Sequence, residues 1–201
     1  MHMQFDQTKT YLNLARSFAG ESQAGMRYQL IARAAFKQGY VELANTIKVI
    51  AKNETVHARR FFEELTKRGG NCIDNIDLEA GYPFHTGDIA TALRLAAKDE
   101  REENERIYAT FAKDAKEEGF DDVAALFNLV ANVEKRHEQI FIYLANAFET
   151  GTLYKNESPI LYVCADCGYM QTANEAWDVC PLCKASQGEV YLHIPYQKEK
   201  L

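Results

Sequence analysis

The chain has 201 residues, which is room for one domain of ordinary size with a small appendage. Hydrophobic residues make up 47% of it and charged residues 26%, a balance that allows a buried core without disulfides. The formal net charge of -6 argues against nucleic acid as a partner, because phosphate binding needs clustered lysine and arginine.

The sequence shows neither a membrane span nor an export signal. No run reaches the roughly 18 apolar residues of a membrane span. The N-terminal stretch MHMQFDQTKT lacks the basic and then apolar layout of a signal peptide. We therefore expect a soluble cytoplasmic protein with no membrane partner.

The first 150 residues predict a mainly α fold. Apolar residues at helical spacing indicate four long helices, at about residues 6–37, 40–68, 87–117 and 120–148. Gly39 and Gly119 separate the members of each pair, as helix-ending glycines do. The connection between the second and third helices is long, and it reads GGNCIDNIDLEAGYPFHT. Two tight hairpins joined by one long crossover form a ferritin-like antiparallel four-helix bundle.

An internal repeat supports this arrangement. A shift of 80 residues superimposes aromatic, glycine and aliphatic positions of the first helical pair on those of the second. The same shift pairs acidic and histidine positions. The matches are Tyr28 with Tyr108, Gly39 with Gly119, Tyr40 with Phe120, Ala44 with Ala124, Ile50 with Val130, Glu54 with Glu134, His57 with His137 and Phe61 with Phe141.

The core-facing stripes of these helices contain charged residues. In the second helix, Glu54 and His57 share a stripe with Ile47, Ile50 and Phe61. The first helix has a stripe of Leu14, Phe18, Glu21, Gly25, Tyr28, Ala32 and Ala35. The other two helices add Glu100, Glu103, Glu134 and His137 at about mid-length.

A bound metal pair explains these inward acids better than the alternative, in which the acids lie at the rim of the core or pair with basic side chains. A lone inward glutamate most often lies at the rim or pairs with a lysine or arginine. Five carboxylates together would bury a charge of -5, and no lysine or arginine lies on those stripes to offset it. Two divalent cations would supply +4, so we predict a dinuclear site. Carboxylate and imidazole ligands suit iron or manganese, with zinc as an alternative, and favour redox chemistry with peroxide or dioxygen.

Two tyrosines stand about two turns beyond the acids of the first and third helices. Tyr28 and Tyr108 are either core aromatics or donors of hydrogen bonds to the ligand carboxylates. Both interpretations place these side chains inside the bundle.

The C-terminal part carries a second metal signal. Cys164, Cys167, Cys180 and Cys183 form two Cys-x-x-Cys pairs separated by twelve residues, a strong pattern for a tetrahedral zinc or iron site. Neighbouring aromatic residues and the redox site upstream favour iron over a structural zinc ribbon. Cys72 lies apart and receives no role.

The composition changes at about Gly151, and this change sets the predicted domain division. We expect the bundle at residues 1–150, a linker at 151–160, and a small β-rich domain at 161–201. The last of these is too small to bury a useful core, so a metal must hold it together.

Several of these motifs occur together in one known family. FAGESQAGMRY around Glu21, NETVH around Glu54, VEKRH around Glu134 and the CxxCGY…CPxC module resemble rubrerythrin over essentially the whole chain. The resemblance implies a ferritin-like bundle followed by a rubredoxin-like domain, and an activity that reduces hydrogen peroxide. It also implies a di-iron centre, one Fe(Cys)4 iron, and a homodimer or higher homo-oligomer. The electron donor would be rubredoxin or an NAD(P)H-dependent rubredoxin reductase.

The resemblance also implies ligand roles. Glu54 and Glu134 would bridge the irons. Glu21 and Glu103 would be terminal ligands of one iron, and Glu100 with His137 would complete the other. His57 would replace Glu103 on the first iron when the pair is reduced, which gives both residues a catalytic role. The four cysteines would hold the single iron.

The third helix departs from the family pattern, because it reads KDEREENE where the family has a motif similar to GENYE. Glu100 and Glu103 are assigned by the five-residue distance from Glu103 to Tyr108, and Glu102 and Glu105 remain alternatives. Three other functions also remain. They are a ferroxidase or iron-handling protein, an oxygen-reducing oxidase, and a zinc-ribbon binding protein with purely structural helices.

Overall fold

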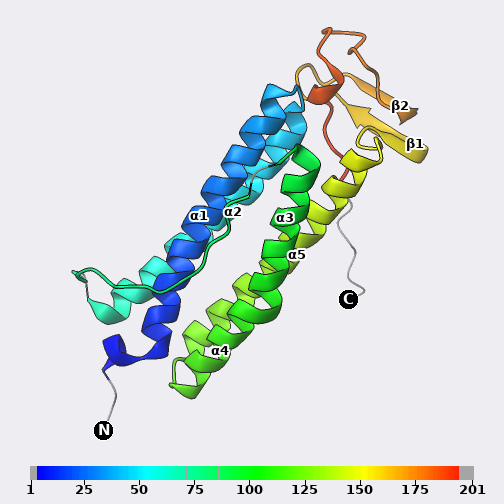
Figure 1. Cartoon of the computed structure of the whole chain (residues 1–201). Helices are drawn as coiled ribbons and strands as arrows, with labels where there is room; N and C mark the ends of the chain where they lie inside the picture. The colour runs from blue at the N-terminus through cyan, green and yellow to red at the C-terminus, as the bar shows by residue number, and fades with distance from the viewer. Residues whose placement is uncertain (1–3, 71, 86, 195–201) are drawn as a thin grey trace.

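The computed structural model describes residues 4–70, 72–85 and 87–194, and it has the predicted mainly α architecture (Figure 1). Two long helical hairpins lie side by side, and a long crossover connects them. A small two-stranded sheet lies at one end of the bundle. The helices are α1 (Lys9–Lys37), α2 (Val41–Gly69), α3 (Ile89–Glu102), α4 (Tyr108–Glu117) and α5 (Asp121–Glu149), and the strands are β1 (Lys155–Val163) and β2 (Met170–Glu175).

The third predicted helix is not a single α-helix, and in this respect the prediction was wrong. A π-helical segment, Glu103–Ile107, joins α3 to α4. Its hydrogen bonds run from residue i to i+5. A pattern of apolar residues spaced by three and four therefore cannot predict it. Such segments are frequent at functional sites. This one begins at a predicted metal ligand.

The two hairpin turns confirm the predicted helix-ending glycines. Gly39 and Gly119 have φ angles of +86° and +85°, in the left-handed region that glycine adopts without steric cost. The following amides bond back to the last helical turn, with Tyr40 donating to the Ala35 carbonyl at 3.1 Å. Phe120 donates to the Ala115 carbonyl at 2.8 Å. Both turns have the Schellman geometry, so the internal repeat extends to the backbone.

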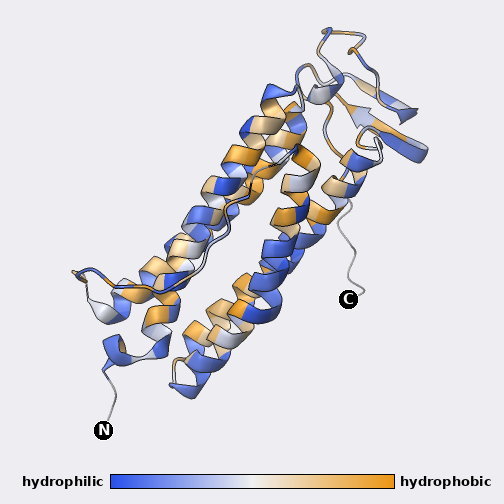
Figure 2. Cartoon of the chain, viewed as in Figure 1, coloured by the Kyte–Doolittle hydropathy of each residue, from blue (hydrophilic) through white to orange (hydrophobic). Residues whose placement is uncertain are grey.

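The core of the bundle consists of two separate apolar clusters. One includes Tyr28, Leu93 and Phe141, and the other includes Phe61 and Phe127. Figure 2 shows a hydrophilic stretch around the π segment, between more hydrophobic parts of the same helical rod. The polar middle of the bundle therefore lies between two apolar ends.

One residue of the predicted core stripe is misplaced. Phe18 is 39% exposed, because it lies on the outer side of α1 against Phe62 of α2, with their ring centroids 5.7 Å apart. A helical stripe is about 100° wide, so residues at its edge can turn outward.

The small sheet begins earlier than expected. β1 pairs antiparallel with β2, and the partners run from Lys155 opposite Glu175 to Val163 opposite Met170. Residues 155–160 belong to this strand, although the change in composition predicted a linker there. The outer ends of the two predicted domains, residues 1–3 and 195–201, lie outside the described residues. Among the described helices, none has both the length and the apolar character needed to cross a membrane.

The small domain packs against the turn between α1 and α2 through a glycine. Gly188 lies so close to this turn that a Cβ there would be 1.7 Å from the Gly39 carbonyl oxygen. Tyr143 of α5 adds a hydrogen bond of 2.8 Å to the His193 carbonyl. These contacts hold the domain at the end of the bundle.

Gly188→Ala is expected to detach the small domain from the bundle. The overlap is with backbone atoms, which cannot rotate away, and overpacking of this kind costs about 1–3 kcal/mol. Hydrogen exchange should become faster at residues 185–194 in the variant. Gly81→Ala is the matched control, since a Cβ at Gly81 meets nothing within 4 Å. Unchanged exchange in Gly188→Ala would contradict the close contact.

Candidate metal centres

Six of the seven predicted acids and histidines meet at the middle of the bundle in two overlapping groups. Their ligand atoms lie within 4.8 Å of one another in each group. Glu54 of α2 and Glu134 of α5 belong to both groups. The first group is Glu21, Glu54, His57 and Glu134, and the second is Glu54, Glu100, Glu134 and His137.

Carboxylate oxygens surround the Nδ1 atom of each histidine. The Nδ1 atom of His57 lies 2.9 Å from Glu134, 3.1 Å from Glu54 and 3.4 Å from Glu21. The Nδ1 atom of His137 lies 2.8 Å from Glu134, 2.9 Å from Glu54 and 3.9 Å from Glu100. One ring nitrogen can donate a single hydrogen bond, so it cannot satisfy three oxygens.

Several buried atoms of these groups lack a hydrogen-bond partner. A buried polar atom without a partner is costly, so each needs an explanation. A pair of cations between the two groups would satisfy all of them, and the residues therefore fit a dinuclear metal site. The atoms are Glu21 Oε2, Glu54 Oε1, Glu100 Oε2, both Glu134 oxygens and His137 Nδ1.

The pKa values of the metal-free site reflect the crowding of its carboxylates. Burial, together with the neighbouring carboxylates, raises the pKa of Glu21 and Glu100 well above the usual range. Burial alone would lower the pKa of His57, but the close carboxylates of Glu134, Glu21 and Glu54 raise it to about 12. The pKa of His137 rises to about 9 for the same reason. Protons therefore offset part of the negative charge when no metal is bound.

The metal-free protein is expected to lose stability as the pH rises from about 6.5 to 9. His57 and His137 have a folded pKa above the ordinary value of 6.5, so they stabilise the fold below 6.5 and cease to do so as they deprotonate. The raised pKa values of Glu21 and Glu100 act in the same direction. Glu54, with a pKa lowered to about 2, acts in the opposite direction but only at pH values below this window.

Metal-loaded protein should show the opposite trend, because cations compete with protons for the same ligands. Urea unfolding midpoints at pH 6.5 and 8.5, measured with and without a chelator, test this. The expectation fails if the chelated protein has a higher midpoint at pH 8.5 than at pH 6.5.

The two tyrosines are both core residues and hydrogen-bond donors. Tyr28 and Tyr108 are 1% and 2% exposed. The Tyr28 hydroxyl of α1 donates to Glu100 of α3, and the Tyr108 hydroxyl of α4 donates to Glu21 of α1. These bonds cross between the two hairpins in a symmetric manner. Each orients one carboxylate and leaves its other oxygen free for a metal.

Glu103 lies apart from the other predicted ligands. It belongs to neither group, and its half-buried side chain lines a cleft at the surface of the bundle. The two alternatives on this helix point away from the site, because Glu105 is exposed and exposed Glu102 pairs with Arg106. The structure thus brings Glu100 to the site and leaves Glu103 at its edge.

Sequence reasoning missed two polar neighbours of the site. The Asn53 side-chain oxygen lies 3.4 Å from His137 Nε2, and this contact helps to direct Nδ1 towards the carboxylates. Burial and the carboxylates of Glu134 and Glu54 raise the pKa of Glu103, and the charge of Arg27, which pairs with Asp99 at 2.7 Å, opposes this rise. Asn53 precedes Glu54 and lies just off its stripe, so helical periodicity alone could not identify it.

The four cysteines of the small domain form the second candidate centre. Their sulfur atoms lie within 4.8 Å of one another, with Cys164 3.8 Å from Cys183 and Cys167 3.7 Å from Cys180. All four are free thiols. A tetrahedron with metal–sulfur bonds of about 2.3 Å has edges of about 3.8 Å, so these distances fit a four-thiolate site.

Two equivalent turns present the cysteines. Gly168 follows the first pair with φ +75°, and Lys184 follows the second with φ +70°. The Gly168 amide donates to the Cys164 carbonyl at 2.9 Å, and the Lys184 amide donates to the Cys180 carbonyl at 3.0 Å. Burial alone would raise the pKa of Cys180, but nearby backbone N–H groups lower it to about 7. At Cys180 this favours the thiolate form that binds metal, whereas burial raises the pKa of Cys164 in the equivalent turn.

The fold and its two centres define a class of protein, a ferritin-like bundle with a carboxylate–histidine cluster joined to a four-cysteine domain. The family model for rubrerythrin matches residues 13–141 and 91–165, and the model for the rubredoxin-like domain of rubrerythrin matches residues 162–189. The chain belongs to the rubrerythrin family. That family carries a di-iron site together with a rubredoxin-like domain.

Curated relatives and solved structures agree with this assignment. The chain is 41% identical to rubrerythrin-1 of Clostridium acetobutylicum, over 88% of this chain and 90% of the relative. It is 38% identical to rubrerythrin of Clostridium perfringens, with the same coverage. A structure of nigerythrin in a mixed-valence state matches with a TM-score of 0.61 and 22% identity, over 93% of this chain and 90% of the other. The last match concerns the fold alone.

Proposed function

We propose that this protein reduces hydrogen peroxide to water at a di-iron site in the bundle. The observation that carries the proposal is the pair of overlapping ligand groups that share Glu54 and Glu134. An iron pair held there would supply two electrons, which is the number needed to convert hydrogen peroxide and two protons into two water molecules. The rubrerythrin relatives support iron as the metal.

The shared residues support a bridging role for Glu54 and Glu134. Glu21 with His57 would hold one iron, and Glu100 with His137 would hold the other. For the reduced pair, we propose His57 as the ligand in place of Glu103, and the position of His57 inside the first group and of Glu103 outside it supports this proposal. Glu103 would return as a ligand in the oxidised protein.

The chain's own residues would manage the protons. Glu103 lies between the site and the surface cleft, so its carboxylate can carry protons from water to the bound oxidant. Tyr28 and Tyr108 keep Glu100 and Glu21 in place while the charge of the site changes. The apolar clusters on both sides of the site keep bulk water away.

The small domain would relay single electrons to the bundle through an iron held by its four cysteines. The donor would be rubredoxin or an NAD(P)H-dependent rubredoxin reductase, which places the protein in the cytoplasm, where thiols stay reduced. A homodimer or higher homo-oligomer would complete this arrangement.

Stopped-flow oxidation of the reduced protein tests the proposal. Peroxide should oxidise it much faster than dioxygen does, with the release of water and without the build-up of an iron mineral. Faster oxidation by dioxygen would point to an oxidase, and iron accumulation would point to a ferroxidase. A colourless small domain that contains zinc would contradict the proposed electron relay.

A further inference from the structure

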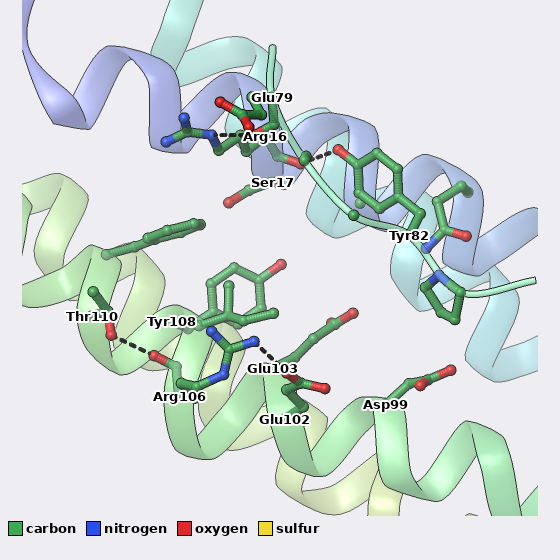
Figure 3. Close-up of a pocket in the computed structure, with 17 residues that line it drawn as sticks. Arg16, Ser17, Glu79, Tyr82, Asp99, Glu102, Glu103, Arg106, Tyr108 and Thr110 are labelled. Atoms are coloured by element: carbon green, nitrogen blue, oxygen red, sulfur yellow. Dashed lines mark hydrogen bonds and ion pairs between the residues drawn. The ribbon is translucent and has the colours of Figure 1, made fainter.

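A cleft of about 390 Å³ opens between α1, the crossover and the π segment (Figure 3). Figure 3 shows Glu103 and Tyr108 pointing into it from one side, and Tyr82 of the crossover facing them from the other. The Tyr82 hydroxyl donates a hydrogen bond of 3.3 Å to the Arg16 carbonyl, which fixes the crossover over α1. Of the seven acids and histidines predicted to bind the metal pair, Glu103 alone lines this cleft.

The cleft is larger than hydrogen peroxide requires. Small-molecule sites in proteins occupy about 300–1,000 Å³, whereas a water-sized molecule occupies about 30 Å³. The side chains of Pro83, Ile107 and Phe111 give the cleft apolar walls. A ligand with an organic group would fill this space, and hydrogen peroxide would leave most of it to water.

The charges of the cleft favour a neutral ligand. Both arginines that line it already have partners, since Arg106 pairs with Glu102 and Arg16 donates to the Glu79 carbonyl at 3.2 Å. Asp99 is likewise paired, with Arg27.

We propose that this cleft binds the organic group of a small alkyl hydroperoxide and directs its O–O group towards Glu103 and the metal pair. The inference rests on the proposed peroxide reduction and extends its substrate class. Cleavage of the O–O bond would take two protons and the two electrons that a reduced metal pair held by these residues would supply. The hydroperoxide becomes one alcohol and one water.

Gly20 of α1 offers a way to fill the cleft without replacing a predicted ligand. It lines the cleft, and a Cβ there would lie at an ordinary contact distance of 3.7 Å from Tyr82 Cε1. A leucine at this position would extend into the space that an organic group needs. Ser22→Leu is the matched control, because Ser22 also lies on α1 but is exposed and lines a different groove.

The test uses the iron-loaded protein with cumene hydroperoxide and hydrogen peroxide. The wild-type protein should be oxidised by both. Gly20→Leu should raise KM for cumene hydroperoxide by about tenfold or more, the usual effect of a lost apolar contact in a pocket. Its kcat/KM for hydrogen peroxide should stay within about threefold of wild type, since the smaller molecule still passes. Ser22→Leu should match wild type with both oxidants.

A binding measurement gives a readout that does not depend on turnover. Saturation-transfer NMR with 2-phenyl-2-propanol, the product alcohol, should detect binding to the oxidised wild-type protein and to Ser22→Leu, but not to Gly20→Leu. If Gly20→Leu does not fold, Tyr82→Ala takes its place, and it should weaken the alcohol signal by removing one wall.

The outcomes separate this inference from the proposed function. Peroxide reduction without cumene hydroperoxide reduction, or an alcohol signal that persists in both cleft variants, overturns the inference alone. Absence of any peroxide reduction overturns the proposed function, and the alcohol signal then still decides whether the cleft binds an organic group.

Discussion

Replacing Glu134 by alanine is expected to remove the metal pair and to reduce peroxide turnover by at least ~100-fold. Loss of a residue that only hydrogen-bonds to a metal ligand already lowers metal affinity or activity by about 10–100-fold, and loss of a direct ligand should cost at least as much. Glu134 is fully buried, belongs to both ligand groups, and has no hydrogen-bond partner on either oxygen. Without it the second group keeps only Glu54 and Glu100 as carboxylates, and one Glu100 oxygen is already bonded to Tyr28. Both metals should therefore be lost together.

The measurement is iron content per chain together with single-turnover oxidation by peroxide. Glu138→Gln is the matched control, since Glu138 is a buried glutamate of the same helix that pairs with Arg101 at 2.6 Å and belongs to neither ligand group. The control should retain its iron. If Glu134→Ala keeps two irons in the bundle, the bridging role is wrong.

The small domain of Glu134→Ala should keep its own iron, because the cysteine centre lies in a separate part of the fold. Its visible absorption then serves as an internal standard. A variant that loses both centres has unfolded more widely than the removal of one ligand explains.

Most of the site could be predicted from the sequence because its charged residues occupy helix positions where apolar residues are expected. Glu54 and His57 stand out on an apolar stripe, and their copies 80 residues later mark them as a unit. The structure brings these residues together with Glu21 and Glu100. Burying so many acids without a counter-charge is unfavourable, so their positions on apolar stripes are enough to indicate bound cations.

The features that were not predicted are those that do not affect the spacing of apolar residues along the sequence. The π segment lies in the polar stretch ENERI, which fits an α-helix equally well. The Glu103 amide still bonds to the Asp99 carbonyl, as in an α-helix, whereas the Tyr108 amide bonds to the Glu103 carbonyl over five residues. The π segment therefore changes the position of Tyr108 relative to Glu103, and helical periodicity could not predict this change. The contact of Asn53 with His137 also depends on the fold and not on periodicity.

The second large effect concerns the electron relay. Cys180→Ala is expected to remove the iron of the small domain and to lower turnover driven by an NAD(P)H-dependent reductase by about 100-fold or more, as loss of a direct metal ligand implies. Cys180 is fully buried and has its sulfur 3.7 Å from that of Cys167. Three thiolates cannot complete a closed tetrahedral site, and this small domain has few buried apolar residues to hold it together.

The bundle should remain intact in this variant, since its apolar clusters lie within the helices. Chemically reduced Cys180→Ala should therefore still be oxidised by peroxide in a single turnover at a rate close to that of wild type. Cys72→Ala is the matched control, because Cys72 is an exposed cysteine outside the four-thiolate centre. Equal loss of the reductase-driven and single-turnover reactions would mean that the cysteine centre supports the bundle's structure instead of relaying electrons. Full reductase-driven turnover would mean that electrons reach the bundle by another route.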